Sequence, residues 1–454
     1  GYYFFDAQKA PAVPITSGSS SWNGRIVGSD NGDTDRYATQ GTSNDAPVGN
    51  GYTVTFADNS DHLDIPQVTQ AGWQVVGTSL GTFAYRVDSD AVSELNLLGN
   101  FGHVNGRKTG DLYGIILLPD SASAADIESA RKLLIDRGAS DAVYAGSLGS
   151  AWYNRLDIVE FGNIDGSAVT SAAYAWYQNQ SLTTFPPMDL STATSFTNAW
   201  KGTTALTSFP AGAKLGTAAT NVNFTSAWQS SGLTSFPALD LSNGNNFFNA
   251  FQGCSSLTTI ENGILLGTAV TAANVNFNSA FLGSGISSLP SNFDLSKGNI
   301  FYKTFMNCSA LTSFPAGAQL GNDATDVNFT QAWRGSGLSS FSTPLLKGKV
   351  FDQTWRDCLS LADFAADVFT NWNPTSILSG VFNDTWDGCT SLTAQSVENI
   401  LTSIDASGKY ATSTGASGGS ALADAGIDID YNVATGSLSA ATNAAVDSLK
   451  AKGW

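Results

Sequence analysis

Three carboxylates recur in the same tripeptide, Asp-Leu-Ser, and have the clearest potential for catalysis in this sequence. Asp189, Asp240 and Asp294 each begin one copy. A pair of carboxyl groups flanking a glycosidic bond can hydrolyse it, one as the acid and the other as base or nucleophile. On alternate coils of a stacked fold, successive carboxylates would lie about 10 Å apart, slightly beyond the separation of inverting glycosidases. Because such recurrence also suits an Asp that accepts backbone amides at a turn, we favour the structural interpretation.

Other residue types that carry enzyme chemistry are scarce or lack their usual neighbours. The two histidines, His62 and His103, lie near turns, and no Gly-x-Ser-x-Gly motif accompanies them. The acidic segment 30–35 lacks the glycine and the distal glutamate of a calcium loop, which favours a solvated turn. No Gly-x-x-x-x-Gly-Lys-(Ser/Thr) phosphate loop occurs. We therefore predict no enzyme activity, no catalytic residue and no cofactor.

The four cysteines, Cys254, Cys308, Cys358 and Cys389, each follow a large aromatic residue by three positions. Neither a Cys-x-x-Cys motif nor a Cys/His cluster is present, which argues against a zinc site. The first three recur on every second repeat, too far apart for a disulfide. Cys358 and Cys389 fall on adjacent repeats, so the sequence leaves a bond between them open, although small buried thiols are the favoured interpretation.

The aromatic residues before these cysteines belong to a repeat, Phe-x-x-(Ala/Thr)-(Trp/Phe), whose last residue we call the anchor. Counted from a degenerate first copy at Trp176, with Ala172 in the Phe position, the anchors are 24, 28, 23, 30, 24, 28, 22 and 31 residues apart. Such a period is typical of stacked-repeat proteins. The predicted structural core consists of the paired aromatics Phe196, Trp200, Phe224, Trp228, Phe247, Phe251, Phe277, Phe281, Phe301, Phe305, Phe329, Trp333, Phe351, Trp355, Phe382 and Trp386.

Each repeat predicts a helical turn followed by a short strand. The Phe and the anchor, four residues apart, would share one face of a helical turn. A Leu or Ile follows five or six residues later and leads into Thr and Ser between apolar residues, often before a proline that ends strand pairing. The strands would therefore present a surface of hydroxyl groups. Our candidate binding residues on this surface are Thr207, Thr234, Thr258 and Thr312.

The repeat resembles a known family. Residues 251–260, Phe-Gln-Gly-Cys-Ser-Ser-Leu-Thr-Thr-Ile, are similar to the BspA-type leucine-rich repeat, whose core is an aromatic residue, Gly-Cys and then Leu-Thr-x-Ile. Segments 305–314 and 386–392 match nearly as well. Departures, with Ser-Gly and no cysteine, occur in the repeats anchored at Trp228, Phe281 and Trp333. The resemblance covers about residues 170–395 and implies surface proteins, adhesins and phage tail-associated proteins that bind rather than catalyse.

The complete prediction is an α+β repeat solenoid of the BspA-like leucine-rich-repeat type over residues 166–395, with about nine coils of alternating 22–24 and 28–31 residues. Residues 1–95 predict a β-rich N-terminal unit, a candidate for attachment, with short strands over 52–56, 73–76 and 83–87.

Residues 96–165 predict a βα cap or linker. Its strand covers 113–118, and its helix has Ile127, Ala130, Leu133 and Leu134 on one face and ends at Gly138. Residues 396–454 predict a C-terminal helical cap with helices over 396–404 and 440–450. Such caps cover the apolar ends of a solenoid.

Composition narrows the function. The formal net charge of −17 argues against nucleic acid and anionic membranes as partners, and no apolar stretch is long enough to cross a membrane. A surface poor in charge and rich in hydroxyls and amides resembles extracellular or virion proteins. We therefore expect a non-catalytic phage virion appendage or tail-fibre protein that presents a rigid repeat surface for host recognition. Its expected partners are other virion proteins, further copies of itself, and a glycan or protein of the host surface.

Three alternatives stay open. The first is a purely structural virion protein, such as a decoration, collar or fibre-shaft subunit, which obligate self-assembly would favour. The second is an extracellular bacterial surface adhesin, which predicts a secretion signal upstream of Gly1. The third is a polysaccharide-degrading tailspike, which sugar release would identify.

Overall fold

A computed structural model describes residues 145–162, 166–429 and 439–454 continuously, and before residue 145 it describes the strands β1–β10 and the helix α1. The chain divides into two compact units, residues 1–218 and 219–454. Both contain coils of a parallel β-solenoid, about nine in total. The predicted repeat solenoid is thus confirmed, but the α+β class is not. In the described residues, helix is confined to α1 (Ala124–Asp136), α2 (Ala394–Ala406) and α3 (Ala440–Ala451), all outside the coils.

The first unit begins with an antiparallel sheet in the order β12-β8-β7-β10-β1-β2-β3, to which β5 adds on β10 and β4 on β5. Strands β6 and β9 form a separate pair. The bounds are β1 (Tyr2–Asp6), β2 (Gly24–Ser29), β3 (Arg36–Ala38), β4 (Val48–Gly49), β5 (Val54–Thr55), β6 (Asp64–Ile65), β7 (Gly72–Thr78), β8 (Gly81–Val87), β9 (Leu95–Asn96), β10 (Asp111–Pro119) and β12 (Ile158–Phe161).

Strands and a helix lie where the sequence predicts them in this unit. Strands β7 and β8 form an antiparallel pair along the whole of β7, from Gly72 to Thr78, and Val75 and Val76 are fully buried. Helix α1 packs on β7 and β10 and buries Ala130 and Leu134 on the side that faces them. The sheet therefore combines strands from both segments 1–95 and 96–165. The side chain of Leu133, and Gly138 as a whole, lie outside the described residues.

Strand β12 links this sheet to the first coils of the same unit. It pairs antiparallel with β8, while Glu160 forms a parallel bridge to Thr184 of a coil. The N–H of Phe161 donates to the Thr184 carbonyl at 3.2 Å. The remaining strands of the unit pair in parallel, β11 (Ala145–Ser147) with β13 (Ala168–Ser171) and β14 (Asp189–Leu190) with β15 (Lys214–Leu215).

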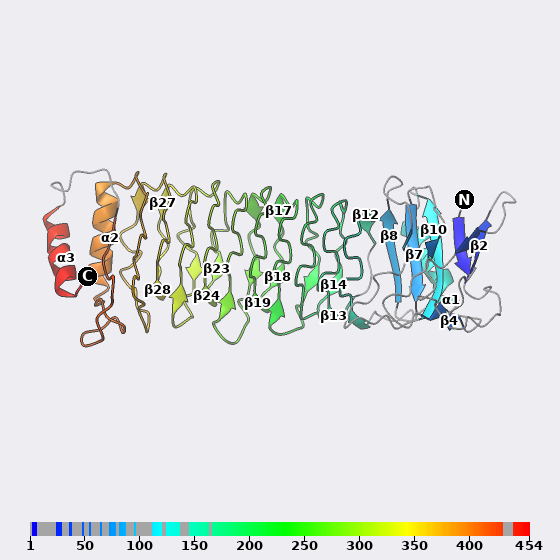
Figure 1. Cartoon of the computed structure of the whole chain (residues 1–454), viewed down its shortest axis with the longest axis horizontal. Coiled ribbons are helices and arrows are strands. Elements are labelled where there is room, and N and C mark those ends of the chain that lie inside the picture. The colour runs from blue at the N-terminus through cyan, green and yellow to red at the C-terminus, as the bar shows by residue number, and fades with distance from the viewer. Residues whose placement is uncertain are drawn as a thin grey trace. The chain divides into compact units, whose positions relative to one another are not determined.

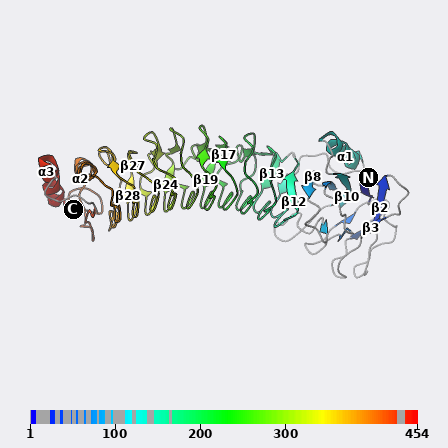
Figure 2. The ribbon, with the colours of Figure 1, turned by 90° about the horizontal axis from the view of Figure 1, so that it is seen from above.

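In the second unit, each coil from the one anchored at Trp228 to the one anchored at Trp355 contributes one strand to a six-stranded parallel sheet in the order β16-β19-β22-β24-β26-β28. Figures 1 and 2 show these coils side by side, each beside the next along the chain. The sheet comprises β16 (Val222–Asn223), β19 (Gly244–Asn246), β22 (Val275–Asn276), β24 (Gly298–Ile300), β26 (Val327–Asn328) and β28 (Gly348–Val350). Further parallel pairs are β17 (Ser235–Phe236) with β20 (Thr259–Ile260), β18 (Asp240–Leu241) with β21 (Leu265–Leu266), β23 (Asp294–Leu295) with β25 (Gln319–Leu320), and β27 (Ser340–Phe341) with β29 (Asp363–Phe364).

The aromatic segment of each coil is not the helical turn that we predicted. In the coil anchored at Trp228, the N–H of Ala227 closes a local turn on the Phe224 carbonyl at 3.1 Å, whereas the anchor N–H donates to Ala250 of the next coil at 2.9 Å. Ser226 adopts a positive φ of 53°, which interrupts any helix. Local turns thus alternate with bonds between coils. The backbone of this segment therefore repeats every four residues, and two side chains that point inward alternate with two that point outward.

Inward side chains make the core. The predicted core residues are all no more than 1% exposed. In the first unit, Trp152, Trp176 and Trp200 stack with ring centroids 5.6 and 5.2 Å apart. In the second unit, the anchor rings stack in the order Trp228, Phe251, Phe281, Phe305, Trp333, Trp355 and Trp386, with centroids 5.1 to 6.1 Å apart.

Helix α2 covers the last strand of the second unit. The side chain of Ser396 accepts from the N–H of Phe364 at 2.9 Å and donates to the Ala362 carbonyl at 2.8 Å. Asn399 donates to the Phe364 carbonyl at 2.7 Å. Side chains of the helix therefore satisfy backbone groups of β29 that another coil would otherwise pair, which closes an open sheet edge.

Candidate binding surfaces of the coils

The four threonines predicted to bind a ligand are exposed, and this column of hydroxyls links neighbouring coils. Within the second unit, the hydroxyl of Thr258 donates to the Thr234 carbonyl at 3.1 Å. Ser287 and Ser339 make the equivalent bonds to the carbonyls of Thr258 at 3.2 Å and Thr312 at 3.0 Å. In the first unit, Thr207 is exposed on its coil. The column therefore has a structural role that the sequence pattern did not reveal.

A second column of hydroxyls lies one residue further along each strand. Thr259, Ser288 and Ser313 are exposed, and in the described part of the chain their hydroxyls have no hydrogen-bond partner. Parallel bridges join Thr259 to Ser288 and Ser313 to Ser340. This column is free to contact a ligand, whereas the first is partly occupied by bonds to the backbone.

The three Asp-Leu-Ser carboxylates act at turns. Each Asp accepts the N–H of the Ser two residues later, at 3.1 Å for Asp189, 3.0 Å for Asp240 and 2.9 Å for Asp294. Asp189 also pairs with the Lys214 ammonium at 2.7 Å. Burial works to raise the pKa of Asp189, but the bonds from Lys214 and Ser191 outweigh it and hold this pKa below its usual value. This geometry is the turn role that we favoured from the sequence.

The four cysteines are free thiols, fully buried, and do not form the bond that the sequence left open between Cys358 and Cys389. Each thiol donates to the carbonyl of the previous anchor; for Cys308 and Phe281 the distance is 3.1 Å. Burial raises the pKa of Cys308 and of Cys358 to about 11. Such thiols stay protonated at neutral pH and are poor nucleophiles.

Three features that we interpret from the sequence as non-catalytic or solvated belong to the N-terminal part of the chain. His62, His103 and the acidic segment 30–35 lie outside the described residues. Within the residues that the structure describes, no group of three or more His, Cys, Asp or Glu side chains is arranged to hold a metal ion. Of the helices described, none has the length and apolar character needed to cross a membrane.

A cluster of three tyrosines is the most exposed aromatic surface on the described coils. Tyr153 and Tyr174 are 39% and 38% exposed, whereas the anchor tryptophans are buried. The ring of Tyr177 stacks on that of Tyr153, with centroids 4.7 Å and planes 11° apart, and lies 5.7 Å from Tyr174. We call Tyr153, Tyr174 and Tyr177 the tyrosine cluster. Burial, followed by the two neighbouring phenols, raises the pKa of Tyr153.

The repeat itself positions this cluster. Tyr153 and Tyr177 directly follow the anchors Trp152 and Trp176, so stacking of the anchors places the two outward rings one over the other. Lys201 occupies the same position on the next coil, with its ammonium 5.9 Å from the centre of the Tyr177 ring. The side-chain amides of Gln178 and Gln180 are bonded to each other at 3.0 Å in the same coil.

The sequence prediction does not include this site because the predicted repeat begins at Trp176 and leaves out the coil at Trp152. That coil has Leu148 in place of Phe, although Ala151 and a spacing of 24 residues to Trp176 follow the repeat rule. Extending the repeat by one copy would have aligned the two tyrosines. Comparison with family models, with curated proteins and with solved structures gave no match to this chain.

Proposed function

We propose that this protein is a non-catalytic phage virion appendage that binds a glycan of the host surface through the tyrosine cluster. The exposure of Tyr153 and Tyr174 is the observation that carries the proposal. Flat aromatic rings pack against the C–H faces of sugars while a phenol or an amide binds their hydroxyls. The amides of Gln178 and Gln180 and the Lys201 ammonium supply such polar groups.

Rigidity supports the same function. The tyrosines are adjacent to buried, stacked anchors, and backbone bonds such as Trp152 N–H to Ala175 O at 2.9 Å join the coils beneath them. Little ordering is therefore required when a ligand binds, which lowers the entropic cost of association. A virion location, attachment to other virion proteins and self-association belong to this proposal.

We also propose that the coils are of the BspA-like leucine-rich-repeat type. Support comes from residues at matching places: Cys254 and Leu257 are both fully buried, three and six residues after the anchor Phe251. The short strand that follows Leu257, β20, begins at Thr259. These are the positions at which the resemblance places Gly-Cys and Leu-Thr-x-Ile.

Binding of the full chain to host-envelope glycans on an array tests the function, with released reducing sugar measured in parallel. We expect saturable binding without sugar release, and at least a tenfold loss of affinity in Tyr153→Ala and Tyr174→Ala. The control is Tyr302→Ala, because Tyr302 is half-buried and also has a lysine ammonium over its ring, that of Lys303 at 4.8 Å.

The outcomes separate the alternatives. Equal loss in all three variants would remove the tyrosine cluster from the proposal. Sugar release would instead identify a tailspike and require Asp189, Asp240 and Asp294 to be substituted. Absence of any binding would favour a purely structural virion protein or an adhesin with a protein receptor.

A further inference from the structure

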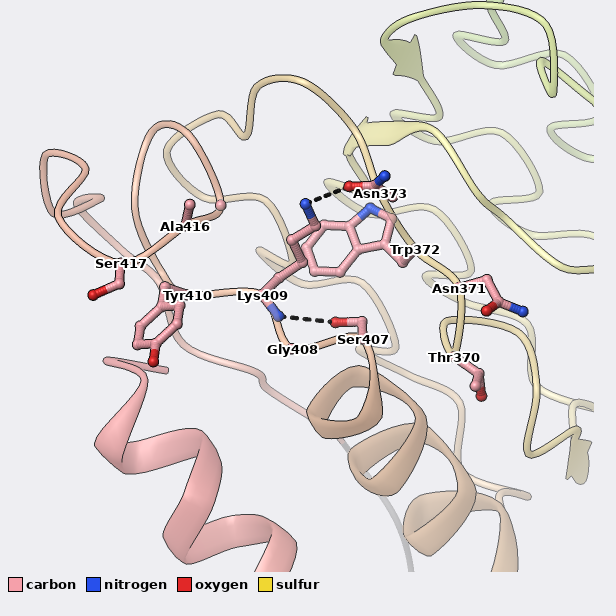
Figure 3. A pocket seen from close by; sticks show the side chains of 11 residues that line it. Thr370, Asn371, Trp372, Asn373, Ser407, Gly408, Lys409, Tyr410, Ala416 and Ser417 are labelled. Carbon is pink, nitrogen blue, oxygen red and sulfur yellow. Dashed lines mark hydrogen bonds between the residues drawn. The ribbon is translucent and has the colours of Figure 1, made fainter.

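A pocket of about 490 Å³ lies in the second unit, between segments 370–373 and 407–417. Figure 3 shows Lys409 between two groups of side chains, with Tyr410 and Ser417 on one side and Asn371 and Asn373 on the other. The pocket has the size of small-molecule sites in proteins. Its lining of amides, hydroxyls and a phenol suits a ligand that is itself rich in hydroxyls.

Three polar side chains of this pocket are available for binding. Asn371 and Ser417 are exposed, and among the described residues their side chains make no hydrogen bond. Tyr410 is half-buried and offers its ring and its hydroxyl. Trp372 stiffens the wall because it is 1% exposed and its indole N–H donates to the Gly348 carbonyl at 2.6 Å.

Two lysine ammonium groups meet at Asn373, a residue of the pocket wall; Lys409 lines the pocket itself, and Lys347 lies behind Asn373. The Lys409 ammonium donates to the side-chain oxygen of Asn373 at 2.6 Å, and the Lys347 ammonium donates to the backbone carbonyl of the same residue at 3.3 Å. Neither lysine forms an ion pair with any carboxylate that the structure describes. The Asp326 carboxylate is bonded to Thr375 and not to either lysine: it accepts from the N–H and from the hydroxyl of Thr375, each at 2.8 Å.

This arrangement leaves positive charge uncompensated in a chain whose formal net charge is −17. An ammonium has three protons to donate, and Asn373 accepts one from each lysine. Burial, followed by the charge of Lys347, lowers the pKa of Lys409, as expected when two cations lack a counter-ion. An anion bound between them would remove this repulsion, whereas a metal cation would increase it.

We propose that this pocket binds a saccharide that carries a carboxylate, a hexuronate, with the carboxylate on Lys409 beside Asn373, where the charge of Lys347 adds to the attraction. Asn371, Ser417 and the Tyr410 hydroxyl bind the sugar hydroxyls, and the Tyr410 ring packs on a C–H face of the sugar. The site is separate from the tyrosine cluster, so its test does not depend on the function proposed above.

The test is calorimetric titration of the full chain with methyl glucuronide and with methyl glucoside, which differ only at C6, a carboxylate in the first and a hydroxymethyl group in the second. We expect methyl glucuronide to bind at least tenfold more tightly. Lys409→Met is expected to lower that affinity at least tenfold while leaving methyl glucoside unchanged. Lys450→Met, in an exposed lysine of α3, and Tyr153→Ala are the controls and should leave both affinities unchanged.

Equal affinity for the two glycosides, absence of binding by either, or an unaltered Lys409→Met variant would overturn the proposal. Inorganic phosphate is the third probe. If it competes with methyl glucuronide at equal concentration, the pocket is a general anion site and the assignment to a saccharide is wrong. Thermal unfolding of Lys409→Met, compared with Lys450→Met, verifies that the variant is folded.

Discussion

In the aromatic segment of each coil, the side chains that point inward build the core, whereas those that point outward form the surface. From the coil anchored at Trp200 onward, inward positions repeat the same kinds of side chain: an aromatic, a small residue, the anchor and then Cys, Ser or Thr. Outward positions change from region to region. They carry the tyrosine cluster in the first unit and charged residues over 334–387 in the second. Fold and binding properties are therefore encoded in alternate pairs of residues along a single segment.

The charged region illustrates the outward positions. Arg356, one residue after the anchor Trp355, pairs with Asp384 at 2.6 Å and Asp387 at 2.8 Å on the next coil. Arg334 occupies the same position one coil earlier and pairs with Asp357 at 3.3 Å. These side chains are between 30% and 49% exposed, so water and salt screen the ion pairs.

Substituting adjacent inward and outward residues tests this contrast most strongly. Trp333→Ala should lower the free energy of unfolding by about 3–5 kcal/mol because it leaves a large cavity in the aromatic stack. Arg334→Ala, the next residue, should cost about 1 kcal/mol or less. Urea denaturation followed by circular dichroism measures both. Equal losses would contradict the division into inward and outward positions.

The buried thiols make the stability of the core depend on pH. A pKa of about 11 for Cys308 and Cys358, raised from 9.0, means that the folded state disfavours the thiolate. Their contribution to stability is therefore complete below pH 9 and lost as the pH rises towards 11, by roughly 2–3 kcal/mol per thiol. The measurement is the urea denaturation midpoint at several pH values between 9 and 11, in the parent chain and in Cys308→Ala and Cys358→Ala. If the midpoint falls with pH as steeply in the variants as in the parent chain, the thiols are not the cause.

Arg356→Gln should have a smaller effect, about 1 kcal/mol or less at low salt, because its ion pairs are partly exposed. Molar salt shortens the screening length to about 3 Å and should abolish most of the difference from the parent chain. Thermal unfolding at both ionic strengths is the measurement. Lys450→Gln, at an exposed lysine without an ion pair among the described residues, serves as the control. A loss that persists in salt would indicate packing by the Arg356 side chain instead.

Thr258→Val should have the smallest effect, about 0.5 kcal/mol or less. It removes the bond from the hydroxyl to the Thr234 carbonyl, but water can replace that bond at an exposed position. Thr259→Val, in the second column of hydroxyls, should leave stability unchanged. A clearly larger loss for Thr258→Val, seen as a lower midpoint in urea, would show that the hydroxyl column holds the coils together.

The sequence was sufficient to identify the coils from Trp176 onward because apolar residues with a fixed period must lie on one side of a repeating backbone. It was not sufficient to identify the local conformation. A four-residue spacing, as between Phe224 and Trp228, is close to the period of a helix, and nothing in the side chains reveals the positive φ of Ser226. The distinction comes from bonds between coils, which are non-local.

The binding surfaces were harder to predict for a related reason. Thr258 looked available because its side chain points outward, but its hydroxyl bonds to the preceding coil. The pocket at Lys409 joins residues more than thirty positions apart, Asn373 and Lys409, in segments with no repeat pattern. Neither the outward positions of the coils nor the segments around Asn373 and Lys409 follow a repeating pattern of residue types. Their spatial neighbours therefore become known only from the folded structure.

The stacked anchors also give this protein a collective optical property. Trp333, Trp355 and Trp386 lie nearly parallel, with centroids 5.6 and 5.8 Å apart. Transition dipoles at such separations couple, so excitation of one indole is shared along the row. The coupled indoles therefore contribute as a group, and not as separate residues, to the near-ultraviolet circular dichroism and the emission polarisation of the folded chain. Displacement of a single coil would alter the spectrum of its neighbours as well as its own.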